Sequence, residues 1–219
     1  MGKVMAITNQ KGGVGKTTTS VNLAASLGAA KRRVLLVDLD PQGNATMGSG
    51  VDKRSVERSS YDVLMGECGL REAIVSAQPA AYQLCAGNAD LTGAEVGLLE
   101  ELGRELRLRH ALATVRDDFD YLIIDCPPAL NMLTENALVA ADSVLVPIQC
   151  EYDALEGLSS LDHVIVVLSG DLDRSPRRDQ RNRGLGQRIV DHTFLRQQGQ
   201  GIGFRHTIDP ERIDPLLGL

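Results

Sequence analysis

The sequence lacks the features that would mark a metal-cluster protein or a membrane protein. Its four cysteines are scattered, with no CxxC pair and no histidine at ligand spacing: Cys68, Cys85, Cys126 and Cys150. This spacing favours reduced thiols in a protein core over a metal or iron–sulfur site. No apolar run approaches the length that spans a membrane, and no secretory signal precedes the first predicted strand. We therefore expect a cytoplasmic protein.

An excess of positive charge is also missing. Lysine and arginine number 23 against 29 aspartates and glutamates, which gives a formal net charge of −6. A surface that is acidic on average does not attract nucleic acid as a whole, so any contact with DNA requires a local basic patch. The 219 residues are 43% hydrophobic and alternate strand-like with helix-like segments. This pattern indicates one α/β domain with room for an appendage.

The most informative stretch is the glycine-rich segment NQKGGVGKTT at residues 9–18. It follows an apolar run over 4–7 and opens a helical pattern over 18–30, the strand–turn–helix context that a phosphate-binding loop requires. Glycines let main-chain N–H groups close around a polyphosphate, and the following helix directs its positive dipole end at the same anion. The residues expected to bind the phosphates of a nucleotide are Lys11, Gly12, Gly13, Val14, Gly15, Lys16, Thr17 and Thr18.

Two residues of this loop have specific predicted tasks. Lys16 is expected to reach the outer phosphates, and the Thr17 hydroxyl is expected to bind Mg²⁺. The usual pattern, G-x-x-x-x-G-K-[ST], is not fully met, because its first glycine falls on Gln10 and a second lysine stands at Lys11. A glycine-rich turn that binds nothing is the alternative interpretation. Two lysines, three glycines and a Thr-Thr pair at these spacings favour the phosphate loop.

Two aliphatic runs each lead to an aspartate placed for the same site. Residues 33–38 indicate a buried parallel strand that runs into a loop containing Asp40, and residues 120–125 indicate a second strand ending at Asp125. Loops at the carboxyl ends of strands form the ligand crevice of a doubly wound sheet. Asp125 is therefore the candidate Walker B ligand of Mg²⁺, and Asp40 is expected beside the phosphates. Turn and helix-capping chemistry is the alternative for the Asp-x-Asp-Pro sequence.

The remaining pattern predicts further elements of an α/β fold. Short helices are expected over 60–66 and 70–76, and a short strand over 83–86. A longer helix over 95–116 is expected to have a solvated charged face and an apolar stripe formed by Leu99, Leu102, Leu106 and Leu112. The later predictions are a helix over 131–140, a strand over 143–147 and a helix over 155–168.

From residue 3 to about 168 the chain resembles the ParA/Soj-type partition ATPases, which carry a deviant Walker A loop. The resemblance rests on NQKGGVGKTTT and on the runs VLLVDLDPQGNAT, DYLIIDCPP, NALVAADSVLVP and QCEYDALEGL. It implies a P-loop NTPase fold of the α/β class, with a doubly wound, mostly parallel sheet and helices on both faces. It also implies Mg²⁺-dependent ATP hydrolysis by a homodimer whose two protomers sandwich two ATP molecules.

The resemblance gives a role to each matching residue. Lys11 matches the signature lysine that crosses to the phosphates of the partner protomer, and Lys16 matches the ordinary phosphate-loop lysine. Thr17 and Asp125 match the Mg²⁺ ligands, and Asp40 matches the residue that helps to position the attacking water. The family also implies a ParB-like centromere-binding partner, nonspecific DNA that would associate the protein with the nucleoid, and no membrane.

Residues 169–219 depart from the family, so the ATPase domain expected over 1–168 is C-terminally truncated or altered. Nine of the 18 arginines fall in this tail, while no lysine follows Lys53. One hypothesis is a coding frame that shifted near Leu168. The other is a disordered, arginine-rich extension that contacts DNA phosphates.

Three functions stay open. The first is a partition ATPase, and the second is a truncated nucleotide- or partner-binding protein without ATPase activity. The third is a MinD-like membrane-cycling ATPase, which would need a basic amphipathic helix at its end. The last residues, IDPLLGL, are too short and too broken by proline to form such a helix.

Overall fold

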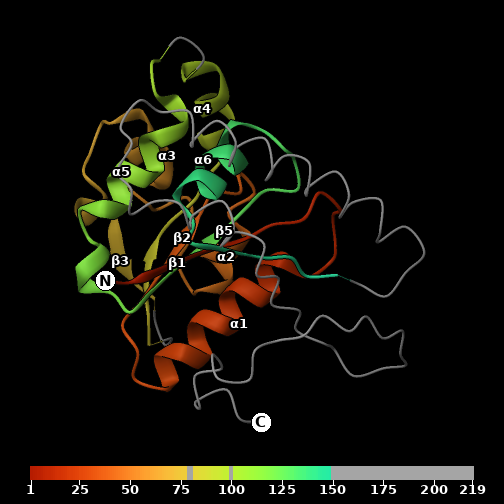
Figure 1. Ribbon diagram of the computed structural model, residues 1–219, viewed down its shortest axis with the longest axis vertical. Coiled ribbons are helices and arrows are strands. Elements are labelled where there is room, and N and C mark those ends of the chain that lie inside the picture. The colour runs from red at the N-terminus through yellow and green to blue at the C-terminus, as the bar shows by residue number, and fades with distance from the viewer. Residues whose placement is uncertain (78–80, 99–100, 149–219) are drawn as a thin grey trace, which may run out of the picture.

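The computed structural model describes residues 1–77, 81–98 and 101–148. The strands in these residues form a single six-stranded sheet. The strand order is β3-β4-β2-β5-β1-β6 (Figure 1). The strands are β1 Lys3–Ile7, β2 Val34–Asp38, β3 Ile74–Ser76, β4 Gln83–Cys85, β5 Tyr121–Asp125 and β6 Ser143–Leu145. β3 runs antiparallel to β4, and every other pairing is parallel. The mostly parallel sheet predicted from the sequence is confirmed.

Helices cover both faces of the sheet, with α1 on one side and α3 to α6 on the other (Figure 1). They are α1 Lys16–Ala29, α2 Asn44–Gly48, α3 Ser60–Met65, α4 Leu91–Gly97, α5 Arg107–Ala113 and α6 Met132–Ala140. Because successive residues of a strand point to opposite faces, Leu35 and Leu36 of β2 enter different cores. Leu35 packs in the same cluster as Leu133 of α6, and Leu36 in the same cluster as Ala24 of α1. The predicted doubly wound architecture is therefore confirmed.

The three central strands end at the same level of the sheet. β1 and β5 are in register from Lys3 beside Tyr121 to Ile7 beside Asp125, and β2 places Asp38 beside Asp125. All five residues of β2 are buried, as expected of a parallel strand covered on both faces. The loops that follow β1, β2 and β5 are thereby brought to one edge.

The order of the strands reverses between β1 and β5. From β1 the chain passes through α1 to β2, and from β5 it passes through α6 to β6, in the opposite direction along the sheet. The two crossover helices consequently lie on opposite faces and leave a crevice beyond the carboxyl ends of the strands between them. In an open α/β sheet this crevice is where ligands bind.

The helix predicted over 70–76 is wrong. Residues Leu70–Glu72 form a single 3₁₀ turn, η1, and Ile74–Ser76 form β3. The β-branched residues Ile74 and Val75 pair with Cys85 and Leu84 of β4 in antiparallel register. Pairing with a strand distant in sequence outweighed the local helical pattern.

The long helix predicted over 95–116 is also wrong. Instead of one helix, this part of the chain contains α4, a 3₁₀ turn at Arg104–Leu106 (η2), α5, and another 3₁₀ turn at Arg116–Asp118 (η3). Gly103 has a left-handed backbone, with φ of 68°, which a helix cannot contain. Leu102, assigned to the apolar stripe, is 99% exposed, whereas Leu112 of the same stripe is buried.

Other predicted elements are confirmed with small shifts of their ends. These are the helix over 60–66, the strand over 83–86, the helix over 131–140 and the strand over 143–147, which correspond to α3, β4, α6 and β6. Asn131 caps α6 by accepting a hydrogen bond from the N–H of Thr134 at 3.1 Å. The helix over 155–168, the boundary at 168, the tail and Leu99 lie outside the described residues and stay predictions.

In the described part of the chain, the helices are all too short or too polar to cross a membrane.

We predict that Gly28→Ala destabilises the fold by about 1–3 kcal/mol. Gly28 lies on the buried side of α1, and a β-carbon there would come within 2.4 Å of the Ala81 carbonyl oxygen, which is backbone and cannot rotate away. Gly48→Ala is the matched control, because its β-carbon would meet only the Val21 side chain, at 3.4 Å. Urea unfolding of both variants measures the difference. Equal stabilities would contradict the close approach of α1 to the backbone of Ala81, just before β4.

Candidate functional site

The segment between β1 and α1 forms an open, glycine-lined loop. Gly13 and Gly15 have φ of 76° and 89°, values that side-chain-bearing residues rarely adopt. A β-carbon placed on Gly12, Gly13 or Gly15 would meet no atom within 4 Å, so the space over the loop is open. Gly15 directly precedes α1, whose first N–H groups have no partner within the helix. The geometry suits an anion with several oxygens.

The Lys16 side chain is buried and bonds back to the backbone of the loop. The residue is 7% exposed, and its Nζ donates a hydrogen bond to the Lys11 carbonyl oxygen at 3.1 Å. Burial lowers the pKa of Lys16 from its ordinary value, while the carboxylates of Asp125 and Asp40 act in the opposite direction. The ammonium group therefore stands between the loop backbone and two acidic side chains.

Asp125 is fully buried at the end of β5 and is held by two hydroxyl groups of α1. Its Oδ2 accepts a hydrogen bond from Thr17 Oγ1 at 2.9 Å, and its Oδ1 accepts one from Ser20 Oγ at 2.6 Å. Burial raises the pKa of Asp125 to about 6, against the effect of these two hydrogen bonds. The Thr17 hydroxyl and the Asp125 carboxylate are thus adjacent oxygen donors, which is the ligand chemistry Mg²⁺ prefers.

Asp40 is placed by a tightly bonded turn after β2. It is 8% exposed, and its Oδ1 accepts a hydrogen bond from the N–H of Gln42 at 2.9 Å. The carboxylate of the buried Asp38 accepts from the N–H of Asp40 at 3.1 Å and from both the N–H and the hydroxyl of Thr46, at 2.8 and 2.7 Å. Asp38 therefore ties the strand end, the turn and the first residues of α2 together.

Burial, and then the neighbouring Asp125 carboxylate, raise the pKa of Asp38 to about 7. The hydrogen bonds from Thr46 and Asp40 act in the opposite direction. Three donors face the Asp38 carboxyl group, so the turn is built around its acceptor oxygens.

The structure brings most of the predicted site residues together. Lys16, Thr17 and Asp125 are in contact through the bonds described above, and Asp40 is close enough to influence the pKa of both Lys16 and Asp125. Lys11 is half-buried at the start of the loop. The remaining loop residues differ in exposure: Gly12, Gly13 and Thr18 are exposed, Gly15 is half-buried and Val14 is buried.

Sequence reasoning missed three polar residues that the structure adds to this region. Ser20 follows Thr17 by three positions, a helical spacing that places both hydroxyls on one face of α1 and was available as a signal. Asp38 was treated as part of the strand, although a buried aspartate at a strand end requires partners. The loop motif predicts no contact for Asn9, whose side chain bonds to the Pro147 carbonyl only because β6 lies beside β1.

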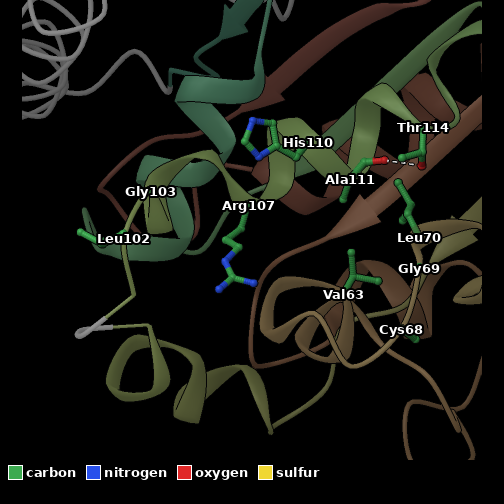
Figure 2. Close-up of a pocket in the computed structure, with 10 residues that line it drawn as sticks. All are labelled: Val63, Cys68, Gly69, Leu70, Leu102, Gly103, Arg107, His110, Ala111 and Thr114. Atoms are coloured by element: carbon green, nitrogen blue, oxygen red, sulfur yellow. Dashed lines mark hydrogen bonds between the residues drawn. The ribbon is translucent and has the colours of Figure 1, made fainter. Parts of the chain in front are cut away.

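A separate hollow of about 390 Å³ lies between η1 and α5, away from the loop. Figure 2 shows the Arg107 side chain projecting into it, with Val63 and Leu70 on the other side. Arg107 is paired with Glu101 at 2.6 Å. The residues lining this hollow include none of the predicted site residues. Among the described residues, no group of three or more His, Cys, Asp or Glu side chains is arranged to hold a metal ion.

The fold and the loop define a P-loop nucleotide-binding protein, and comparison with known proteins supports this class. Residues 2–175 match the model of a family described as AAA domain (AAA_31). The sporulation initiation inhibitor protein Soj of Bacillus subtilis is 54% identical over 161 residues, which are 74% of this chain and 64% of Soj. The chain belongs to the ParA/Soj-type family of partition ATPases.

Two further relatives extend this comparison. An uncharacterized protein of Pseudomonas putida is 66% identical over 161 residues, and the chain spans 61% of its length. The solved structure of cobyrinic acid a,c-diamide synthase from Mycobacterium smegmatis, with bound ADP and magnesium, is 45% identical with a TM-score of 0.75. That similarity covers 78% of this chain and 69% of the synthase chain. Among the curated relatives, the chain spans 61% of the Pseudomonas putida protein and 64% of Soj, which is less than two thirds of each.

We predict that the stability of the wild type, relative to Asp38→Asn, falls as pH rises from about 4 to about 7. A carboxyl group whose pKa is higher in the folded state binds its proton more tightly there. Its contribution is full below the unfolded pKa of about 3.9 and is lost as pH rises through the folded value of about 7. One such group changes the unfolding free energy by at most ~1.4 kcal/mol per pH unit.

Urea unfolding at several pH values measures this difference. Asp117→Asn removes the same charge from a side chain that is 85% exposed, so it serves as the matched control. Parallel pH profiles for the wild type and Asp38→Asn would contradict a raised pKa at Asp38.

Proposed function

We propose that this protein is a Mg²⁺-dependent ATPase of chromosome or plasmid partitioning. The observation that carries the proposal is the contact of Thr17 with Asp125 at 2.9 Å beneath the open glycine loop. It joins the start of α1, where a phosphate-loop protein binds Mg²⁺, to the end of β5, where such proteins carry the Walker B aspartate. Relatives named as chromosome partitioning proteins support the biological setting.

The loop residues bind the nucleotide in this proposal. The N–H groups of residues 12–18 surround the phosphates, with the glycines leaving room for them and Val14 buried beneath. Lys16 exchanges its hydrogen bond with the Lys11 carbonyl for the outer phosphate oxygens, so that its positive charge is satisfied both with and without nucleotide. Thr17 and Asp125 hold Mg²⁺, directly or through water. A solved neighbour with a bound ATP analogue and magnesium supports this assignment.

Hydrolysis requires an oriented water and neutralised phosphate charge. Asp40 positions the attacking water from its turn after β2, which the Asp38 carboxylate holds in place. Lys16 stabilises the charge that develops on the outer phosphate. Bound Mg²⁺ would supply further neutralisation of the phosphate oxygens.

Two copies act together in this proposal. Lys11 reaches the phosphates held by the second copy, so turnover depends on dimerisation in the way that an arginine finger makes turnover depend on a partner. We propose further that a ParB-like centromere-binding protein stimulates the dimer, and that the dimer associates with nonspecific DNA of the nucleoid in the cytoplasm. Each of these assignments rests on the family to which the chain belongs.

A second candidate is a protein that binds nucleotide or a partner without hydrolysis. The observation that favours it is that the family match ends at residue 175 and leaves the last 44 residues of the sequence unmatched. The phosphate loop, Asp40 and Asp125 all lie within the matched part, so both candidates predict nucleotide binding. Turnover separates them.

We predict that Mg²⁺-ATP raises the thermal unfolding temperature of the wild type and that Lys16→Ala abolishes most of this rise. At a ligand concentration of 100 times Kd, binding to the folded state contributes about 2.7 kcal/mol. Lys3→Ala removes a lysine from the exposed start of β1 and should leave the rise unchanged. Thermal unfolding with and without nucleotide measures the effect. No rise in the wild type would contradict nucleotide binding.

Asp40→Ala is the companion variant for hydrolysis. It should retain the ATP-dependent rise but lower phosphate release by roughly 100-fold, because water positioning is lost while the phosphate contacts stay. A wild type that binds ATP without turning it over would favour the second candidate. A rate that persists in both Lys16→Ala and Asp40→Ala would come from contaminating activity.

We predict that ATP turnover per mole of wild type rises with protein concentration. The turnover of Lys11→Ala should not rise, and should stay at the rate of the dilute wild type. The reason is that a lysine supplied by the second copy is present only in the dimer. Phosphate release over a dilution series measures this dependence. Turnover in Lys11→Ala that follows the wild-type curve would contradict a role for Lys11 across an interface.

A further inference from the structure

The Asn9 side chain joins the start of the phosphate loop to the end of β6. The residue is only 6% exposed, and its two polar atoms bond in different directions. Its Oδ1 accepts a hydrogen bond from the N–H of Lys11 at 3.0 Å. Its Nδ2 donates to the Pro147 carbonyl oxygen at 2.8 Å. One buried amide therefore bridges two loops that are 138 residues apart in sequence.

The bond to Pro147 continues the pairing of β1 with β6 beyond the strands. The ladder ends with Ile7 beside Leu145 and with the N–H of Thr8 donating to the Leu145 carbonyl at 3.1 Å. In a parallel ladder, the next N–H on this side would be that of Gln10, directed at residue 147. The Asn9 side chain takes that acceptor instead, which leaves the backbone after Asn9 to turn into the loop.

The bond to Lys11 starts that turn. An asparagine oxygen that accepts from the N–H two residues on forms an Asx turn, which fixes the direction of the chain. The residue fixed in this way is Lys11, and its carbonyl oxygen is the acceptor for Lys16 Nζ at 3.1 Å. The two lysines of the loop are thus both connected to Asn9 through the Lys11 backbone.

We propose that Asn9 is a positioning residue that anchors the phosphate loop on the segment after β6, and thereby aims Lys16 at the outer phosphates of its own nucleotide and Lys11 at those held by the second copy. The inference rests on the proposed function, since it concerns the same nucleotide site. Asn9 itself does not touch the nucleotide. Its effect is greatest for the ligand with the most outer phosphate charge, so it favours Mg²⁺-ATP over Mg²⁺-ADP.

The test compares the affinities of wild type, Asn9→Ala and Asn9→Ser for Mg²⁺-ATP and for Mg²⁺-ADP, measured by titration calorimetry. Asn88→Ala is the matched control, because Asn88 forms the same type of turn with the N–H of Asp90, at 3.2 Å, before α4. Thermal unfolding without nucleotide reports whether each variant keeps its fold. Asn9→Ser keeps an oxygen that can accept from Lys11 and covers the case in which Asn9→Ala fails to fold.

We expect Asn9→Ala to weaken Mg²⁺-ATP binding by about tenfold, the equivalent of one lost hydrogen bond, and Mg²⁺-ADP binding by less. Asn9→Ser should lie between wild type and Asn9→Ala, and Asn88→Ala should match wild type. If Asn9→Ala binds Mg²⁺-ATP with wild-type affinity, the inference is wrong. It is also wrong if Asn9→Ala loses thermal stability and its affinities for Mg²⁺-ATP and Mg²⁺-ADP fall equally. A wild type that binds neither nucleotide refutes the proposed function, and the inference with it.

Discussion

The buried carboxylate of Asp125 is the constraint on which the site depends. It lies at the end of a central strand where water is excluded, and a carboxylate there is tolerated only with hydrogen-bond donors. Thr17 and Ser20 provide them from one face of α1. Because α1 begins at Lys16, directly after the loop, this bonding fixes where the helix starts relative to β5. The position of the glycine loop follows from that of the helix.

The site concentrates ionisable groups in a buried region: Lys16, Asp38, Asp40 and Asp125 are all at most 8% exposed. Asp38 and Asp125 are buried side by side in register, and burial raises the pKa of each. Burial also lowers the pKa of Lys16, which stands beside Asp125 and Asp40. Such an arrangement is unfavourable in isolation, and the proposed cation and phosphate anion would compensate for it in the crevice. Clusters of buried charge of this kind are typical of functional sites.

Much of the fold and the core of the site could be predicted from local patterns. Residues 34–37 and 122–124 are aliphatic without a polar break, which is typical of a strand covered on both faces. The loop between β1 and α1 was identified because its chemistry is contained in ten consecutive residues. The helices predicted over 70–76 and 95–116 failed for different reasons. β3 exists only through its pairing with β4, whereas a left-handed Gly103 backbone lies between α4 and α5 and cannot belong to a continuous helix.

The sequence by itself determined the alternation of strands and helices, the glycine loop, and which residues are proposed to bind phosphate and Mg²⁺. These depend on side-chain size, backbone freedom and spacing along the chain. Only the tertiary structure decided which distant polar groups meet: Ser20 with Asp125, and Asn9 with Pro147. Contacts of this kind depend on strand order and register, because residues far apart in sequence become neighbours only when the sheet is assembled.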